Sequence, residues 1–323
     1  MTQDVQESFL SGKRVPLCIT RSRGDIALHE FVALHRATLR EKLTDHGAIL
    51  FRGFGADTPG AFAAFTEATG STSIDYRFRS TPRTQVEANI FTSTEYPARR
   101  EIPLHNENAY HTVWPLRLAF CCVTPATQDG ETPIADMRDV TRSIGAALLD
   151  RFEQARVEYT RHFHTGVDIP WNEVFQTSDR DEVIRLCHAS EIEAEWLGDD
   201  AQLLRTRQLC QGVARHPATG ERVFFNQAHL FHASSLGQDH LNLMLEMFGA
   251  GRLPRHAKLG DGTEISAPDL AAIHSAFNAN AIRFTWRRGD VLWIDNMRVA
   301  HGRRPFQGPR RILAALMDAS NGP

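Results

Sequence analysis

The chain has 323 residues, of which 42% are hydrophobic, and this is enough to bury a large core. Its net charge of −3 and the lack of a basic cluster argue against nucleic-acid binding. No apolar run approaches the roughly 20 residues that span a membrane, and the N-terminus lacks the basic start and apolar core of a signal peptide. We therefore expect neither nucleic acid nor a membrane as a partner.

The cysteines indicate the compartment. The chain has five, and none forms a C-x-x-C pair. An odd, scattered set is typical of reduced thiols in a cytosol, so the sequence predicts a cytoplasmic location. Adjacent Cys121 and Cys122 lie in an apolar run and are interpreted as small buried hydrophobes.

The N-terminal part alternates helix and strand signals. After an extension over about 1–20, residues 28–46 carry apolar side chains at helical spacing, and Gly47 ends them. Residues 48–54 form a short apolar run that predicts a strand. Thr58 followed by Pro59 is typical of a capped helix start.

The remaining chain is interpreted as mostly strand. Strands are predicted over 116–123, 155–162, 222–226, 281–286, 291–296 and 311–318, and helices over 139–152, 241–248 and 266–277. Residues 165–220 are polar with little regular pattern, and we expect this insert to cover the active site. The sequence therefore predicts one domain over 1–323. Its fold class is mainly β with helical decoration, a double-stranded β-helix (jelly roll) with flanking helices.

A pair of metal-ligand residues stands out at His105 and Glu107. On an extended backbone, residues two apart point to the same face, so one strand can offer an imidazole and a carboxylate to one cation. His301, just past a strand, is the expected third ligand. Two histidines and one carboxylate leave three coordination positions open, which is typical of non-haem iron(II) oxygenases.

Two other histidine pairs compete with this set. His162 and His164 also place two imidazoles on one strand face, and His229 and His232 lie on one side of a helical turn. The residues alone leave these alternatives open.

Several segments resemble the taurine dioxygenase-like (TauD/TfdA) oxygenases, closest to the branch that includes the aspartyl hydroxylase of syringomycin biosynthesis. The resemblance covers roughly 28–318. It is carried by residues 80–84, 91–97, 102–122, 130–140, 222–236 and 289–313. It favours the set of His105, Glu107 and His301 as iron(II) ligands. Halogenating relatives carry Ala or Gly in place of the acid, so Glu107 argues against halogenation.

The resemblance also implies cosubstrate residues. Thr132 matches a threonine that hydrogen-bonds the far carboxylate of 2-oxoglutarate, and Arg311 matches the arginine that pairs with it. An arginine fork suits a carboxylate. Arg310 and Arg311 are adjacent on a predicted strand, so only one can face inward, and the family spacing favours Arg311. O2 is the second cosubstrate.

The implied reaction is hydroxylation of an unactivated C–H of an amino acid or amino-acyl group, free or on a carrier protein, in specialised-metabolite (antibiotic) biosynthesis. Taurine dioxygenase itself grips its sulfonate with an arginine four residues past the cosubstrate arginine, and Ala315 stands there. This disfavours the first alternative, catabolic oxygenolysis of a small acid. The second alternative is a catalytically silent binding module. Candidates to meet a substrate charge are Arg83, Arg298, Arg303 and Arg304.

Overall fold

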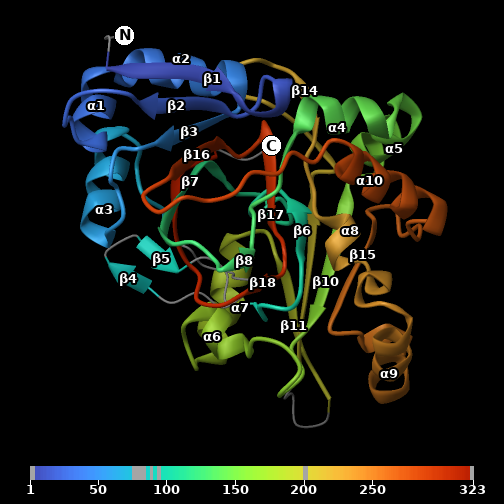
Figure 1. Cartoon of the computed structure of the whole chain (residues 1–323). Coiled ribbons are helices and arrows are strands. Elements are labelled where there is room, and N and C mark those ends of the chain that lie inside the picture. Colours follow the sequence, from blue (N-terminus) through green and yellow to red (C-terminus); the bar gives the residue numbers. More distant parts are fainter. Residues whose placement is uncertain (1–3, 75–84, 88–89, 93–95, 199–202, 321–323) are drawn as a thin grey trace.

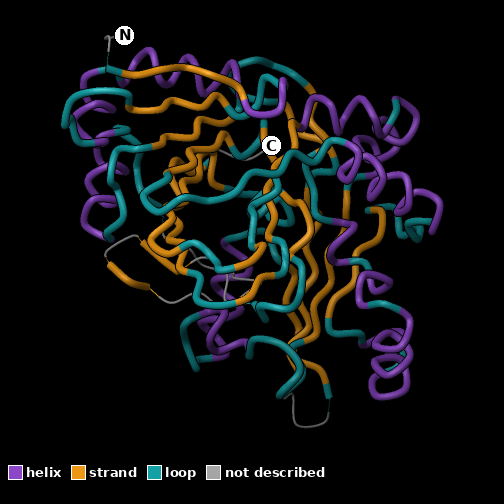
Figure 2. The backbone as a smooth tube through the Cα atoms, viewed as in Figure 1, coloured by secondary structure: helices purple, strands orange, loops and turns teal. Residues whose placement is uncertain are grey.

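The structure is a computed structural model that describes residues 4–74, 85–87, 90–92, 96–198 and 203–320. The segment over 80–84 and the candidate Arg83 lie outside the described residues. The chain forms strands in antiparallel sheets, with helices packed around them (Figures 1 and 2).

The largest sheet has eight strands, and its labelled strands lie on the left in Figure 1. In spatial order these are β1 (Val5–Phe9), β2 (Leu17–Arg21), β3 (Ala48–Arg52), β16 (Val291–Asp295), β7 (Pro115–Thr124), β19 (Arg311–Ala319), β5 (Ile90–Thr92) and β4 (Gln85–Glu87). All neighbouring pairs are antiparallel except β2 and β3. The expected N-terminal extension thus contributes two strands to this sheet.

A smaller sheet faces it and carries the metal-ligand candidates. Its strands are β6 (Ile102–His105), β17 (Val299–Arg303) and β9 (Ile134–Asp136). Val299 and Ile134 on its inner face pack against Leu118, Phe120 and Leu292 of the large sheet in one buried cluster. Two antiparallel sheets enclosing a core in this way form the predicted jelly roll.

Helices cover both outer sides of this sandwich. On the large sheet lie α1 (Leu28–Leu34), α2 (Arg36–His46) and α3 (Pro59–Ala68), which share a cluster with Phe51, Trp293 and Leu313. On the small sheet lie α4 (Met137–Ile144), α5 (Ala146–Ala155), α8 (Ala228–Phe231) and α10 (Ala267–Ala279), which share a cluster with Leu104 and Ala300. The strands of both sheets are therefore buried on two faces, as their continuous apolar runs require.

The insert is more regular than expected. It contains α6 (Trp171–Phe175), α7 (Arg180–Ala189), β11 (Glu193–Leu197) and β12 (Leu203–Cys210). Its two strands extend a four-stranded sheet in the order β11-β12-β10-β15, with β10 at Val157–His162 and β15 at Arg255–Leu259. The alternation of buried and exposed residues along β12 marks a strand with one solvated face. Its cover over the active site stays a prediction.

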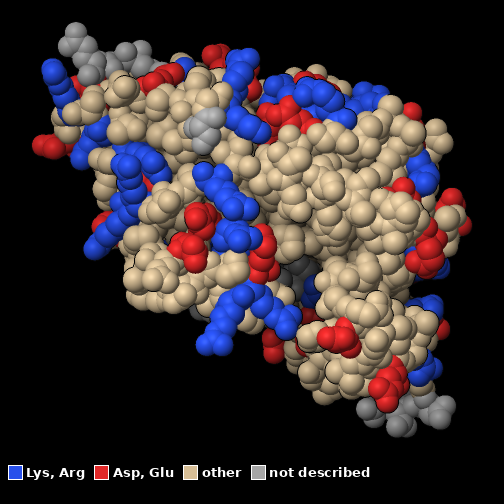
Figure 3. Space-filling model, turned by 45° about the vertical axis from the view of Figure 1, so that its right-hand side comes forward, with Lys and Arg blue, Asp and Glu red and all other residues tan. Residues whose placement is uncertain are grey.

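The remaining short elements connect these layers. They are β8 (Gln128–Asp129), β13 (Val213–Arg215), β14 (Arg222–Phe224), α9 (Gln238–Phe248), β18 (Phe306–Gln307) and three 3-10 turns at Leu10–Gly12, Ala233–Leu236 and Ala250–Arg252. On the face shown in Figure 3, basic and acidic side chains lie in small separate groups.

Three predicted elements differ in detail. The helix over 28–46 is divided at His35, and the one over 139–152 is divided at Gly145, whose φ of 84° interrupts helical geometry. The strand over 281–286 is wrong: only Ile282 bridges, to Ile134.

Candidate metal centre

The structure brings the three predicted iron ligands together. β6 and β17 pair with His105 directly opposite His301, so both rings point to the inner face of the small sheet. Glu107 lies two residues past His105, and its Oε2 is 3.9 Å from His105 Nε2 and 3.8 Å from His301 Nε2. One ligand atom of each residue lies within 4.8 Å of the others. A single cation can contact all three.

The hydrogen bonding of His105 fixes the proton on its ring. Nδ1 lies 2.9 Å from the carbonyl oxygen of Pro103. A carbonyl only accepts, so Nδ1 carries the proton and Nε2 keeps its lone pair toward Glu107 and His301. Metal-binding histidines in proteins are oriented by this kind of second bond. The residues therefore fit a divalent metal ion.

The burial of Glu107 also indicates a metal ion at this position. Glu107 is 5% exposed, and a carboxylate out of water is costly without a charged partner. A divalent ion held by two neutral imidazoles supplies that charge. The set leaves half of an octahedral ion's coordination open, which suits iron(II).

A clamp around the backbone of Glu107 was not foreseen from the sequence. Asn296 Oδ1 accepts from the Glu107 N–H at 2.8 Å, and Asn296 Nδ2 donates to the carbonyl oxygens of Glu107 at 2.9 Å and Pro115 at 2.8 Å. Asn106 Nδ2 donates back to the Asn296 carbonyl at 2.6 Å. Asn296 and Asn106 are fully buried. These bonds fix the position from which the Glu107 side chain leaves the backbone.

α8 supports the same segment from the outer side. Gln227, just before this helix, donates from Nε2 to the carbonyl of Asn106 at 2.6 Å. His229 Nε2 donates to the carbonyl of Leu104 at 3.0 Å, and burial lowers its pKa to about 3, so the ring is neutral. The backbone on either side of His105 is thus held by two buried side chains.

The expected preference for Arg311 is wrong in its geometry. Arg311 is exposed, whereas Arg310 is half-buried beside Thr132. Arg310 donates from Nε to the Gly130 carbonyl at 3.1 Å and from Nη2 to Thr132 Oγ1 at 3.5 Å. Ile312, Ala314 and Leu316 of β19 pack toward the small sheet, and Arg310, two residues before Ile312, lies on the same side by the alternation of a strand.

Trp286 completes this group and was also missed. Its Nε1 donates to Thr132 Oγ1 at 2.9 Å, and Thr132 is 5% exposed. Burial lowers the pKa of Arg310 to about 10, with Arg303 adding to the effect, so Arg310 remains charged near neutral pH. A half-buried arginine and a hydroxyl side by side suit a carboxylate.

The competing histidine pairs make other contacts. His162 Nδ1 lies 2.9 Å from the Leu253 carbonyl, and His164 Nε2 lies 2.7 Å from the Arg252 carbonyl. His229 holds β6 as described above, while the ring of His232 lies beside His256. Neither pair shares a metal position.

The described candidates for a substrate charge have partners within the protein. Arg298 donates to the Thr44 carbonyl at 2.5 Å and lies 3.8 Å from Asp136. Arg303 donates to three carbonyls of residues 96–100, and Arg304 pairs with Glu101 at 2.9 Å. These contacts indicate that the three arginines stabilise the fold.

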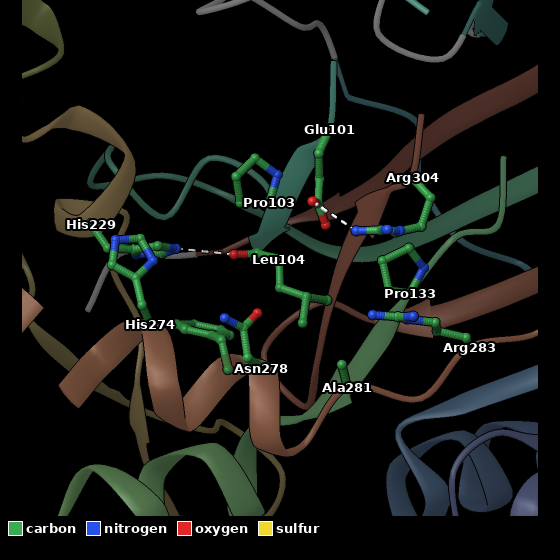
Figure 4. Close-up of a pocket in the computed structure, with 11 residues that line it drawn as sticks. Glu101, Pro103, Leu104, Pro133, His229, His274, Asn278, Ala281, Arg283 and Arg304 are labelled. Carbon is green, nitrogen blue, oxygen red and sulfur yellow. Dashed lines mark hydrogen bonds and ion pairs between the residues drawn. The ribbon is translucent and has the colours of Figure 1, made fainter. Parts of the chain in front are cut away.

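A cleft of about 390 Å³ lies on the outer face of β6, away from the iron ligands. Figure 4 shows it between His229 and His274 at one end and Arg283 and Arg304 at the other, with Leu104 between them. Leu104 belongs to the buried cluster outside the small sheet. This cleft is therefore separate from the metal centre.

Comparison with known proteins agrees with the fold and the site. A family model described as "Taurine catabolism dioxygenase TauD, TfdA family" matches residues 11–317. With the metal-ligand set it identifies an iron(II)- and 2-oxoglutarate-dependent dioxygenase. The chain belongs to the TauD/TfdA family, as its motifs predicted.

Relatives and solved structures cover nearly the whole chain. The dapdiamide synthesis protein DdaC of Enterobacter agglomerans is 38% identical over 310 residues, which are 96% of this chain and 93% of that protein. The crystal structure of PvcB from Pseudomonas aeruginosa has a TM-score of 0.57 at 16% identity, covering 98% and 92% of the two chains. The crystal structure of AAD-2 in complex with Mn(II) and N-oxalylglycine has a TM-score of 0.59 at 13% identity, covering 100% of this chain and 99% of that chain. These two structures share the fold.

Two further predictions can be compared with the structure. All five cysteines are buried and none is in a disulfide, including Cys121 and Cys122. Among the described residues, no helix has the length and apolar character to span a bilayer.

Proposed function

We propose that the chain hydroxylates an unactivated C–H of an amino acid or amino-acyl group in a specialised-metabolite pathway. The observation that carries this proposal is the group of His105, Glu107 and His301, whose ligand atoms all lie within 4.8 Å of one another and could hold one metal ion. The assignment to a biosynthetic pathway is supported by the 38% identity to a dapdiamide synthesis protein.

In this proposal His105, Glu107 and His301 hold the iron. Bound iron(II), with 2-oxoglutarate and O2, supplies the oxidising chemistry that removes hydrogen from carbon. The protein keeps the ligands fixed through Asn296 and the carbonyl of Pro103, and it excludes water from the buried Glu107. Glu107 occupies the position that halogenating relatives leave to chloride, which argues against halogenation.

Arg310 and Thr132 would bind the far carboxylate of 2-oxoglutarate. Thr132 Oγ1 accepts from Trp286, so its own proton is available to a carboxylate oxygen. Arg310 lies beside it and provides the charge. This replaces Arg311 as the residue proposed for that role.

The proposed substrate class rests on the residues that stand four positions past Arg310 and Arg311. Four residues past Arg310 is Ala314, and four past Arg311 is Ala315, and both are buried among apolar side chains. Neither can grip a sulfonate, which disfavours catabolism of a small sulfonic acid. We propose an aspartyl-like or similar amino-acid substrate, free or on a carrier protein, and an enzyme that acts in the cytoplasm.

The test is succinate release measured against a panel of free and carrier-bound amino acids. The proposal expects release coupled to hydroxylation of one class of amino acid. Coupled turnover of sulfonates alone would contradict it. A silent binding module would be indicated if iron(II) and 2-oxoglutarate, added to apo-protein without oxygen, gave no visible charge-transfer band.

A further inference from the structure

A second group of two histidines and one glutamate lies outside the iron centre. His232 directly follows α8, His256 lies on β15, and Glu264 lies in the turn before α10. Glu264 Oε2 is 3.0 Å from His256 Nε2 and 3.7 Å from His232 Nε2. The two rings are 4.9 Å apart, and one ligand atom of each residue lies within 4.8 Å of the others.

These distances match a small divalent ion. Zinc bonds to imidazole nitrogen are about 2.0–2.1 Å, which places neighbouring ligand atoms of a tetrahedral site roughly 3.3 Å apart. The side chains of His232 and His256 are 15% and 24% exposed, and that of Glu264 is 66% exposed. The rings are thus held in place while the acid borders solvent, from which water can supply a fourth ligand.

We propose that His232, His256 and Glu264 form a zinc site separate from the iron centre. Imidazole and carboxylate ligands suit zinc, and three protein ligands with one water is a common zinc arrangement. No residue is shared with the group of His105, Glu107 and His301. The proposal therefore does not depend on the function assigned to that centre.

The present hydrogen bonds show what zinc must displace. His256 Nδ1 accepts from the Ala233 N–H at 3.3 Å, and His232 Nδ1 accepts from the Ser234 N–H at 3.3 Å, so each Nε2 carries the proton and faces Glu264. Zinc at Nε2 requires the proton of each ring to move to Nδ1. His232 keeps a partner, because Ser234 Oγ lies 2.8 Å from Nδ1 and can accept. At His256 the Nδ1 proton would face the Ala233 N–H, so the ring must turn away from this donor, which lowers the affinity for zinc.

The proposed zinc site would connect three neighbouring segments, one of which supports the iron-binding strand. Zinc would join the end of α8 to β15 and to the turn before α10, elements that lie close together in Figure 1. At its start, α8 carries the side chains of Gln227 and His229 that hold the backbone around His105. A zinc ion would therefore fix the far end of the helix that supports the iron-binding strand.

The experiment measures zinc bound per chain after chelator treatment, by equilibrium dialysis and elemental analysis. The background is the His105→Ala/His301→Ala variant, which removes both imidazoles of the iron centre. We expect one equivalent of zinc in this background and none after the further change His256→Ala. His240→Ala, an exposed histidine on α9 outside the group, is the matched control and should keep the equivalent.

A second variant guards against misfolding. Glu264 is largely exposed, so Glu264→Gln should leave the fold intact and weaken zinc binding at least about tenfold, since a charged oxygen ligand becomes a neutral amide. Zinc should raise the unfolding temperature of the background variant and have a smaller effect with Glu264→Gln. Equal zinc binding with and without His256 and Glu264 would overturn the proposal.

Discussion

The described part of the chain holds two groups of the same composition, two histidines and one glutamate, and their hydrogen bonds differ. In the iron centre, His105 donates its Nδ1 proton to the Pro103 carbonyl, which directs Nε2 toward Glu107 and His301. In the surface group, His256 accepts at Nδ1 and directs an Nε2 proton at Glu264. The same three residue types therefore have different hydrogen bonding in the two groups. In the iron centre the histidine is oriented for a metal ion, whereas in the surface group the histidine donates to a glutamate that a metal ion must first displace.

Burial deepens this contrast. Glu107 is 5% exposed and its backbone is clamped by Asn296, whereas the Glu264 side chain is 66% exposed. A buried acid needs a cation nearby, and an exposed acid is already stabilised by water. Removing the acid should therefore reduce the metal affinity of the iron centre far more than that of the surface group.

The largest expected effect is that of Glu107→Ala. This variant should lose iron binding and fall to background succinate formation, because the only anionic ligand of the set is gone. The charge-transfer band formed with iron(II) and 2-oxoglutarate under anaerobic conditions measures the first, and succinate release the second. Glu264→Ala is the matched change and should retain both. Normal turnover by Glu107→Ala would remove Glu107 from the centre.

The next largest effect is on the binding of 2-oxoglutarate, and it contrasts a half-buried arginine with an exposed one. Arg310→Ala should raise the half-saturating 2-oxoglutarate concentration by about 30-fold or more, because removing one partner of a buried charge pair costs about 2–5 kcal/mol. Arg311→Ala should change it by less than about twofold, as for an exposed charge. Succinate release at varied 2-oxoglutarate measures both. The reverse ranking would restore Arg311 to the role.

These two adjacent arginines show where a sequence stops being informative. The spacing of His105 and Glu107 on an extended segment predicts their shared face, and the motifs predict His301 and Thr132. The choice between Arg310 and Arg311 depends on which alternate residues of β19 face the small sheet. Residues 312–317 are apolar and buried on both faces, so their types do not indicate that face. A shift of one residue would reverse which side chain faces inward.

Contacts between distant segments were equally beyond prediction. Asn296 and Gln227 meet the iron-binding segment across 189 and 121 residues of chain. The sequence shows only two polar residues after the apolar run 291–294, the second of them Asn296, and two after the apolar run 223–225, the second of them Gln227. The jelly roll and most strand positions were predictable because apolar runs mark buried strands, but the bonds that orient the ligands appear only once the sheets are assembled.

A smaller effect should follow from loosening the clamp. Asn296→Asp replaces an amide donor, which serves the carbonyls of Glu107 and Pro115, with oxygen that cannot donate near neutral pH. Supporting contacts of this kind are worth about 10–100-fold in metal affinity. Anaerobic iron titration should show that loss, while the stoichiometry at saturation stays unchanged.

Asn280→Asp provides the control for that change. It also removes two hydrogen bonds of a side-chain amide, to Ser143 Oγ and the Ala276 carbonyl, neither of which belongs to the iron ligands or to the residues that hold their backbone. It should reduce the free energy of unfolding without altering iron affinity. Equal iron affinities for the two variants would show that the Asn296 bonds act on stability alone, and the difference between the two glutamates would then rest on burial.

The smallest effect is a pH dependence of stability through α8, the helix that links the two groups. Burial lowers the pKa of His229 to about 3, below the value near 6.5 of an unfolded chain. Between these values the unfolded chain binds more protons, so stability falls as pH drops from about 6.5 toward 3. His229→Gln keeps a donor for the Leu104 carbonyl without a titrating ring, and its stability should fall less steeply over that range in urea unfolding. His111, whose pKa burial lowers to about 4, keeps some slope in both proteins. Identical slopes would mean that His229 is not buried as a neutral ring, and the support of β6 by α8 would lose its basis.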